Sequence, residues 1–265
     1  MVGVAETIRG VPGLLILPIV ALSSFLTLLV TLLIVPLFDP PALSSLNAFK
    51  EAWFKYFWWW FGPVTKPVFA PSIRPLLDRA YGVVLDIGPA SGIWIEELGR
   101  VFKTGTISRV YGVEPNPRFH SQLEAKIKAA GLLSVYQPIV AYAEELEAHD
   151  IKKGSIDTII TVHVLCSIGP HADEITKRLY EYLKPGGQWL VYEHVVSRST
   201  SVRLWQRLFD PIWGHLLGSC ELCRDTEATL RRAGDWDTVK LGPDPKEGPL
   251  AALPHVIGKL VKRKT

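Results

Sequence analysis

Residues 83–99, VVLDIGPASGIWIEELG, constrain the fold of this chain more than any other stretch. An apolar run typical of a buried strand ends in Asp86, a turn of small residues follows, and a helical pattern starts near Ser91. In open α/β sheets, a nucleotide-like ligand binds beyond the carboxyl end of a strand that leads into such a turn. Gly88 permits the tight turn, and Gly92 lets backbone and ligand approach closely.

The turn alone leaves the class of cofactor open. Its spacing, Gly88-Pro89-Ala90-Ser91-Gly92, is not the G-x-G-x-x-G of dinucleotide-binding proteins, and Pro89 lacks an N–H that a pyrophosphate would use. A nicotinamide or flavin cofactor and S-adenosylmethionine fit it equally. Glu114 ends the second apolar run, where a carboxylate can accept two hydrogen bonds from a ribose diol. The alternative is a surface acid in the EPNP turn.

The rest of the chain alternates apolar runs with helical patterns. Strands are predicted at 82–88, 107–115, 134–140, 155–165 and 186–196, and helices from 91, over 116–130 and over 172–183. This alternation indicates repeated βαβ units and a parallel sheet. The end of the chain differs, because a helix near 226–233 precedes two more strands, 236–241 and 255–262. These two strands suit an antiparallel hairpin at one edge of the sheet.

The N-terminal region contains an uncharged apolar stretch, residues 14–38. As a helix it would be about 37 Å long, enough to cross a hydrocarbon core of about 30 Å. A cleaved signal peptide has a shorter apolar part, and a core helix rarely lacks a polar face. We therefore expect a membrane helix with the following domain on the cytosolic side. The charges used for this orientation are Glu6 and Arg9 before the stretch and Lys50, Lys55, Lys66, Arg74 and Arg79 after it.

An aromatic segment, AFKEAWFKYFWWWFGP at 48–63, follows the apolar stretch. It fits a helix in the lipid headgroup region, or a lid packed on the globular domain. The prolines of this region predict an irregular linker, and they are Pro63, Pro67, Pro71 and Pro75. We divide the chain into an N-terminal membrane anchor (1–40), an aromatic interfacial segment with a Pro-rich linker (41–71) and a catalytic domain (72–265).

Charge and cysteine content exclude several classes of function. The formal net charge is +3, and the basic residues are dispersed apart from the last few, so no nucleic-acid partner is expected. Three cysteines are too few for a disulfide framework and fit a reducing compartment. Cys220 and Cys223 form a single C-x-x-C pair, whereas a structural zinc site needs four ligands. Cys166, His163 or His215 could complete such a site, but their spacing does not require it, and no metal is expected.

Five segments occur in the order typical of one superfamily: LDIGPASG, YGVEPNPRF, AYAEEL, IDTIITVHVL and LKPGGQWLVYEH. Over about residues 80–262 the chain resembles the class I S-adenosylmethionine-dependent methyltransferases. The resemblance implies an α/β fold with a Rossmann-like, mostly parallel seven-stranded sheet, helices on both faces and an antiparallel terminal strand, here preceded by the membrane helix. It also implies S-adenosyl-L-methionine as the cofactor.

Within that superfamily, TVHVLCSI, WQRLFDPIWGHLLGSCELCRDT and HVIGKLVK resemble the membrane-anchored, methyltransferase-like thiol S-methyltransferases of endoplasmic reticulum and lipid droplets. This resemblance implies a small-molecule acceptor, a hydrophobic thiol, and contact with membrane lipid through the N-terminal segment. The chain departs from the family at Gly218-Ser219-Cys220, where the family tends to read Asp-Gly-Cys, and at His163, which replaces an apolar residue. Both departures fall near the presumed acceptor pocket and leave the acceptor open.

The resemblance also assigns residues to the cofactor. Gly88, Ala90 and Gly92 would pass under its methionyl part, Asp86 would order its ammonium group, and Glu114 would hold its ribose. The remaining predicted contacts are Pro115 and Asn116 beside the adenine, Ala143 and Glu144 at its polar edge, and Val162 and His163 on the sulfonium side. Alternatively, Asp86 caps the helix predicted from Ser91.

The predicted catalytic residues are His194 and Asp210. A thiol has a free pKa of about 8.5, so a modest base is sufficient to deprotonate it, and imidazole titrates near neutrality. His194, which Glu193 could orient, is the first candidate, and Asp210 is the second. The alternatives are a packed histidine and a helix cap. Trp205, Trp213, His215 and Cys220 would shape the acceptor pocket or form core.

Two other functions stay open from the sequence. The first is O- or N-methylation of a lipid, quinone or secondary metabolite, and the second is a scaffold that keeps the cofactor fold without turnover.

Overall fold

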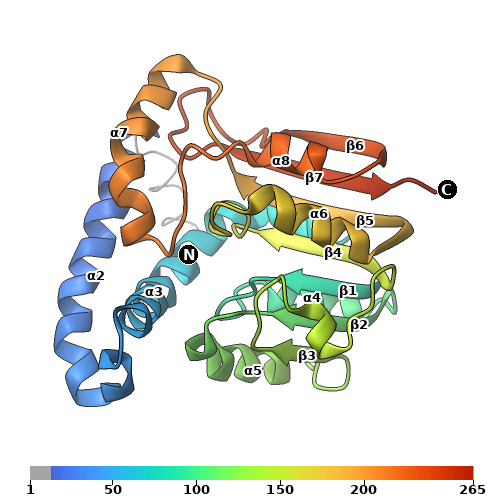
Figure 1. Cartoon of the computed structure of the whole chain (residues 1–265), viewed down its shortest axis with the longest axis horizontal. Coiled ribbons are helices and arrows are strands. Elements are labelled where there is room, and N and C mark those ends of the chain that lie inside the picture. The colour runs from blue at the N-terminus through green and yellow to red at the C-terminus, as the bar shows by residue number, and fades with distance from the viewer. Residues whose placement is uncertain (1–12, 265) are drawn as a thin grey trace.

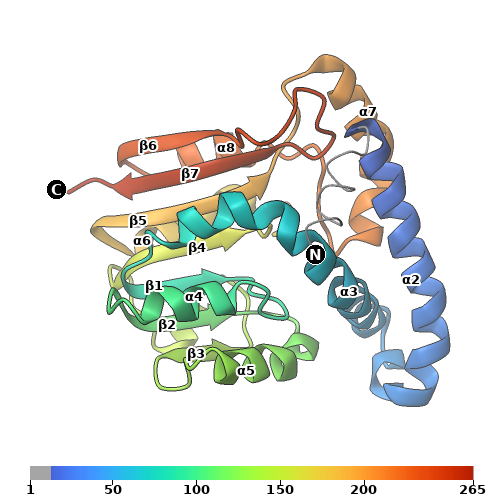
Figure 2. The ribbon, with the colours of Figure 1, turned by 180° about the vertical axis from the view of Figure 1, so that it is seen from behind.

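The computed structural model describes residues 13–264 and contains one seven-stranded sheet in the order β3-β2-β1-β4-β5-β7-β6 (Figures 1 and 2). The strands are β1 (Gly82–Ile87), β2 (Ile107–Val113), β3 (Tyr136–Ile139), β4 (Ile156–Val162), β5 (Leu183–His194), β6 (Trp236–Pro243) and β7 (His255–Lys262). Strands β1 to β5 pair in parallel, and β7 is antiparallel to both β5 and β6. The predicted fold class, including the antiparallel edge, is confirmed. Glu6 and Arg9, the charged residues from which the orientation of the apolar helix was predicted, lie outside the described residues.

Two hydrophobic cores cover the two faces of the sheet. Successive residues of a strand point to opposite faces, so Leu85 and Ile87 join one core while Val84 joins the other. On the first face lie α6 (Ala172–Tyr182) and α8 (Thr226–Arg232); on the second lie α4 (Ile95–Phe102), α5 (His120–Ala129) and the end of α3 (Leu46–Leu77). Short 3₁₀ turns are η1 (Gly13–Leu15), η2 (Pro40–Leu43), η3 (Pro117–Phe119) and η4 (Leu146–His149).

Three helices stand at the carboxyl ends of the parallel strands: α2 (Ile16–Phe38), α3 and α7 (Thr200–Leu216) (Figures 1 and 2). The indole N–H of Trp53 on α3 donates to the Ser24 carbonyl of α2 at 3.0 Å, and that of Trp60 donates to Thr27 Oγ1 at 3.1 Å. Ser24 Oγ in turn donates to the Leu216 carbonyl of α7 at 2.5 Å. These contacts fix α2 against both of its neighbours.

The Pro-rich stretch is helical, so the predicted irregular linker is wrong. Helix α3 runs without a break through Pro63, Pro67, Pro71 and Pro75. Each proline lacks an N–H and frees the carbonyl four residues earlier, but prolines four residues apart fall on one side of the helix. The Pro71 carbonyl, freed by Pro75, accepts a hydrogen bond from Lys246 Nζ at 3.0 Å. The boundaries drawn at residues 40 and 71 stay predictions.

The apolar stretch forms the helix that was expected. The segment Gly13–Phe38 has a mean hydropathy of 2.5 and is long and apolar enough to cross a membrane. By length and composition alone, a core helix or a signal sequence would also meet this criterion.

Candidate active site

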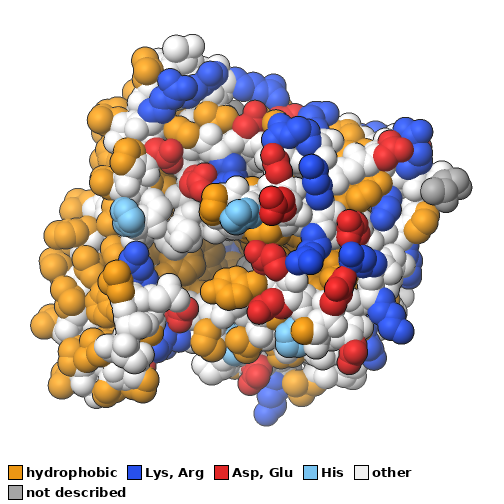
Figure 3. Space-filling view, viewed as in Figure 1, with side chains coloured by type: hydrophobic (Ala, Val, Ile, Leu, Met, Phe, Trp, Pro, Cys, Tyr) orange, Lys and Arg blue, Asp and Glu red, His pale blue; other side chains and the backbone are white. Residues whose placement is uncertain are grey.

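A cavity of about 830 Å³ lies between the carboxyl ends of the parallel strands and helices α3 and α7, and the space-filling view shows the hollow (Figure 3). A second cavity of about 30 Å³ lies on the other side of the turn after β1. All residues predicted to bind the cofactor line one of the two. Those at the larger cavity are Gly88, Ala90, Glu114, Pro115, Asn116, Ala143, Glu144, Val162 and His163, and those at the smaller one include Asp86 and Gly92. Their individual roles toward the cofactor stay predictions.

The turn after β1 adopts a backbone that favours glycine. Gly88 has a φ of +64°, and a Cβ there would lie 2.7 Å from Val164 Cγ2. Gly92 has a φ of +74°, and Ala90 also has a positive φ, of 48°. Because this left-handed backbone interrupts the helix, α4 begins at Ile95 instead of near Ser91. The turn therefore curves around the end of β1 with its backbone against the cavity.

Asp86 is buried at the end of β1 and accepts a hydrogen bond from the Tyr136 hydroxyl at 2.9 Å. Tyr136 reaches it across Gly112 of β2, where a Cβ would lie 2.2 Å from the hydroxyl oxygen. Burial raises the pKa of Asp86 to about 7, and the Tyr136 bond opposes this shift. Within residues 13–264, no side chain hydrogen-bonds to the N-terminus of α4, so the predicted alternative of a helix cap is wrong.

Glu114 follows β2 and faces the same turn. Its Oε2 accepts the Ala90 N–H at 3.0 Å, and its Oε1 accepts the Asn116 N–H at 2.9 Å. Burial raises the pKa of Glu114 to about 7, the two backbone hydrogen bonds lower it, and the Asp86 carboxylate raises it further. Each carboxylate oxygen keeps a second lone pair, so ribose hydroxyls can still bind. Two buried, uncompensated carboxylates beside one turn are suited to a cationic ligand.

Asn116 and His163 line the cavity from the loops after β2 and β4, the strands on either side of β1. Asn116 Oδ1 accepts the Arg118 N–H, and its Nδ2 donates to the Glu51 carbonyl of α3 at 3.2 Å. The His163 ring lies edge-on to Phe69 with 5.0 Å between ring centroids. Burial, helped by two neighbouring histidines, lowers the pKa of His163 well below its usual value. His163 is therefore neutral and serves as part of the cavity wall.

The first predicted base, His194, does not reach the cavity directly. Within residues 13–264, Cys220 lines the cavity and His194 does not. His194 Nε2 lies 2.8 Å from the Cys220 Sγ. Glu193 points to the other face of the sheet and accepts the N–H groups of Val164 and Leu165 at 2.9 and 3.1 Å. The prediction that Glu193 orients His194 is therefore wrong.

The second predicted base, Asp210, lies in the middle of α7 and lines the cavity. Its Oδ1 accepts the Leu222 N–H at 2.7 Å, so it holds the loop after α7 and is not a helix cap. Of the other residues predicted near the acceptor, His215 and Cys220 line the cavity, while Trp213 is buried in the core between α2, α3 and α7.

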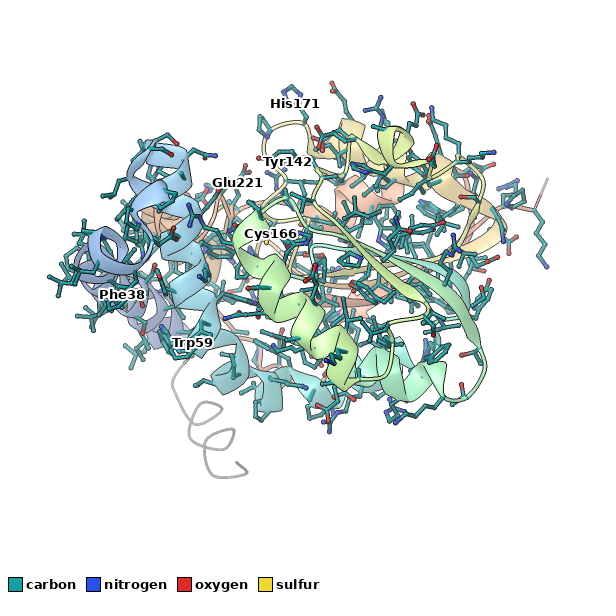
Figure 4. The ribbon with its side chains drawn as sticks, turned by 90° about the horizontal axis from the view of Figure 1, so that it is seen from below. Phe38, Trp59, Tyr142, Cys166, His171 and Glu221 are labelled. Carbon is teal, nitrogen blue, oxygen red and sulfur yellow. The ribbon has the colours of Figure 1, made fainter. Side chains whose placement is uncertain are left out.

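Helix α3 supplies a wall of the cavity, as the lid alternative expected. Lys50, Phe54 and Trp58 repeat every four residues and line it, and Trp58 reaches the smaller cavity as well. Trp59, in contrast, is exposed on the outer side of the helix pair (Figure 4). The four-residue spacing is the signal in the sequence that marks the inner face of this helix.

Comparison with known proteins fits this geometry. Residues 67–233 match the family described as "Methyltransferase domain". Human thiol S-methyltransferase TMT1A is 29% identical over 223 residues, which are 80% of this chain and 87% of that protein. Human thiol S-methyltransferase TMT1B is 27% identical over 252 residues, 91% of this chain and 99% of that protein.

Solved structures agree in fold. The S-adenosylmethionine-dependent methyltransferase SibL, in its apo form, superimposes with a TM-score of 0.57 at 20% identity, covering 78% of this chain and 58% of that one. The family match spans more than half of the sequence and contains the turn after β1 and Glu114. The chain therefore belongs to the methyltransferase domain family and is an enzyme that uses S-adenosylmethionine as its methyl donor.

Proposed function

We propose that this enzyme methylates the sulfur of small hydrophobic thiols at a membrane surface. The acceptor class is supported by the similarity to two human thiol S-methyltransferases over most of the chain. The structural observation that carries the proposal is the wall opposite the turn, where neutral His163 and the hydrogen-bonded pair Cys220 and His194 lie together. A thiol needs only a weak proton acceptor to become a nucleophile, and this wall holds one.

The residues around the turn fit the cofactor. Asp86 and Glu114 would face its ammonium and ribose groups, and the cavity of about 830 Å³ leaves room for an acceptor. When bound, S-adenosylmethionine supplies a methyl group on a positively charged sulfur. The chain contributes positioning: Trp58 and Val162 keep water from the reacting atoms, and the wall orients the acceptor sulfur for in-line attack. The proton of the acceptor thiol passes to the imidazole of His194. It passes through the Cys220 thiol, or directly after a small movement of the Cys220 side chain.

A panel of acceptors tests this proposal. We expect labelled S-adenosylmethionine to methylate small alkyl and aryl thiols, and phenols and amines of the same shape to remain unlabelled. Glu114→Gln is the matched control, because it keeps the size of the side chain and removes the charge. Labelling of phenols or amines with inert thiols would contradict the thiol assignment and favour O- or N-methylation. Absence of any cofactor affinity in calorimetry would favour a scaffold.

Membrane contact is supported by the pattern of α2. Its buried face carries Ser24, Thr27 and Thr31 beside apolar side chains such as Leu17 and Val35, while its exposed side chains are all apolar. A surface helix of a protein in water exposes polar side chains instead, whereas helix contacts inside a bilayer are rich in small and hydroxyl residues. The exposed side chains are Ile19, Leu22, Phe25, Leu26, Leu29, Val30, Leu32, Leu33, Leu37 and Phe38. Figure 3 shows them as an apolar flank beside the hollow.

The neighbouring helix α7 extends this flank. Leu204, Leu208 and Ile212 are exposed and four residues apart, so they lie on one side of α7, which runs beside α2 in both ribbon views (Figures 1 and 2). Because α2 is packed along α3 and α7, we propose that it lies in one leaflet beside the domain, with the cavity opening near the lipid surface. By the resemblance to the thiol S-methyltransferases, we assign this membrane to the endoplasmic reticulum or lipid droplet, with the domain in the cytosol.

Flotation with liposomes tests the membrane contact. We expect the full chain to float, and a variant with Leu22, Leu29 and Leu33 each changed to Gln to stay at the bottom with its melting temperature little changed. Leu133→Gln is the control, since Leu133 is equally exposed but lies between α5 and β3. Equal flotation of the triple variant and the control would overturn the assignment of α2 to the membrane.

A further inference from the structure

Three side chains from distant parts of the sequence meet at the place where Cys220 lines the cavity: Cys166, His194 and Cys220. Their sulfur and nitrogen atoms lie within 4.8 Å of one another. Cys166 is buried, whereas Cys220 is partly exposed and lines the cavity. The two segments that carry the cysteines are fastened together, because the Glu221 N–H donates to the Cys166 carbonyl at 3.0 Å. Figure 4 shows Cys166 and Glu221 near each other.

The two thiols differ in reactivity. His194 Nε2 lies 2.8 Å from the Cys220 sulfur and can take its proton, which is the arrangement that produces a reactive thiolate. A hydrogen bond with Cys220 and burial raise the pKa of Cys166 well above its usual value, although His194, which also hydrogen-bonds Cys166, opposes this shift. Cys166 is therefore an inert thiol until a neighbouring sulfur becomes electrophilic. An exposed attacking thiol next to a buried second thiol is the arrangement of a disulfide-exchange pair.

A metal site explains the cluster less well. Ligands at about 2.0 to 2.3 Å from a zinc ion stand roughly 3.5 Å apart, more than the 2.8 Å between His194 and Cys220. A metal-binding imidazole also normally donates its second N–H to an acceptor. His194 Nδ1 has no hydrogen-bond partner in the part of the chain that the structure describes. The observations favour two free thiols and one imidazole.

We propose that Cys220 and Cys166 form a thiol–disulfide exchange site for small disulfides that enter the cavity. Cys220 gives its proton to His194, and its thiolate attacks one sulfur of R–S–S–R. The S–S bond of the substrate breaks, a Cys220–S–S–R bond forms, and one RS⁻ leaves. His194 releases this first proton to solvent and takes the proton of Cys166, whose sulfur attacks the Cys220 sulfur, releases the second RS⁻ and forms a Cys166–Cys220 disulfide. Two electrons pass from the cysteines to the substrate, and a soluble thiol of the glutathione class restores the pair.

This activity gives the cavity a source of thiolate acceptors. Only this link to methyl transfer rests on the proposed function. If that function holds, each thiolate is released in the cavity where methyl transfer takes place. The enzyme would then use the disulfide form of its acceptors as well as the free thiol. The exchange itself is independent of the methyl donor and can be measured without it.

The test uses 5,5′-dithiobis(2-nitrobenzoate), a disulfide that releases a coloured thiolate, with the full-length chain, no reductant and no S-adenosylmethionine. All proteins carry Cys223→Ser, so that only the two cysteines of interest remain. We expect the parent to release two thiolates per chain in a rapid phase and to contain an internal disulfide by peptide mass analysis. We expect Cys166→Ser to release one and to retain the adduct.

We expect Cys220→Ser to lose the rapid phase, with a rate at least tenfold lower. Thermal melting of each variant confirms that it is folded, and Cys220→Ala provides a second variant if the serine fails to fold. A rapid phase that persists without Cys220, or a parent protein that ends as a mixed adduct with no internal disulfide, would overturn the proposal. Because the assay contains no methyl donor, a failed methylation experiment does not affect its result.

Discussion

We propose that Asp86 is buried for ligand binding at the expense of stability, and Asp86→Asn tests this directly. Its pKa is about 7 in the fold and about 3.8 in the unfolded chain. The folded state therefore holds the proton more tightly, and stability decreases as the pH rises from about 4 to 7. At pH 7.5 the difference of about three pKa units corresponds to about 4 kcal/mol against folding. The asparagine carries no charge and its oxygen still accepts the Tyr136 hydrogen bond.

The net gain is smaller, because a buried amide N–H group without a partner costs about 1 to 3 kcal/mol. We expect Asp86→Asn to stabilise the cofactor-free protein by about 2 kcal/mol at pH 7.5, or roughly 4 to 8 °C in melting temperature. At pH 5 the penalty on the wild type falls to about 2 kcal/mol, so the two proteins should melt together. The stabilisation by added S-adenosylmethionine should be lost in the variant.

Differential scanning fluorimetry at both pH values, with and without cofactor, measures all four quantities. Asp237→Asn is the control, because Asp237 is exposed on β6 and should change the melting temperature little. A variant less stable than the wild type at pH 7.5 without cofactor would refute the reasoning, since Asp86 would then be stabilising as a charge. Equal cofactor stabilisation in both proteins would remove Asp86 from the binding site.

Three further predictions concern the same cavity. Asp86 and Glu114 both have a pKa of about 7, so the ionised fraction of each falls about tenfold from pH 8 to pH 6. The Kd of the cationic cofactor should therefore rise about a hundredfold over this range, with proton release on binding measured by calorimetry in two buffers. Gly88→Ala should destabilise by about 1 to 3 kcal/mol in denaturant unfolding, and more than Gly105→Ala, which also has a positive φ but open space around it. Trp58→Ala should weaken cofactor binding at least tenfold because it opens the wall that α3 forms, and it should also lower the melting temperature, because Trp58 packs against the core between α2, α3 and α7.

The sequence predicted the sheet and the cofactor side of the cavity well, because both depend on local patterns. Apolar runs that alternate with helical periodicity determine a parallel sheet, and the carboxyl ends of such strands meet at one edge. Asp86 and Glu114 end adjacent strands, so their proximity follows from the strand order. The antiparallel edge was also predicted from a local pattern, since its two strands lack a helix between them.

The parts that the sequence did not predict depend on contacts between distant segments. Taken alone, the prolines of α3 predict a break in the helix. Burial of Ile73, Leu76 and Leu77 in the core stabilises the helix instead, and Lys246 donates a hydrogen bond to one of the freed carbonyls. The C-x-x-C spacing pairs Cys220 with Cys223 and left Cys166 as one of three possible further ligands, and His194 was not predicted beside them. The fold instead brings Cys220 to Cys166, far away in the sequence, and Cys223 is not part of the cluster.

Contacts between distant segments also couple α2 to the cavity, and Thr27→Val tests that coupling. Thr27 Oγ1 accepts the Trp60 indole N–H at 3.1 Å, and Trp60 lies on α3, whose inner face lines the cavity. The substitution keeps the shape of the side chain but leaves the indole N–H without its partner, at a cost of about 1 to 3 kcal/mol. We expect α3 to loosen and the Kd for S-adenosylmethionine, measured by calorimetry, to rise severalfold.

Thr31→Val is the control for this experiment, because the Thr31 hydroxyl is buried on the same face but donates only to the Thr27 carbonyl within α2. It should leave the Kd unchanged. If both variants weakened cofactor binding equally, α2 would act through general stability. If neither did, α3 would keep its position against the cavity without α2. A weaker cofactor affinity in Thr27→Val alone would indicate that α2 fixes the α3 wall through Trp60, so that the helix we propose to face the lipid also determines how firmly the methyl donor is enclosed.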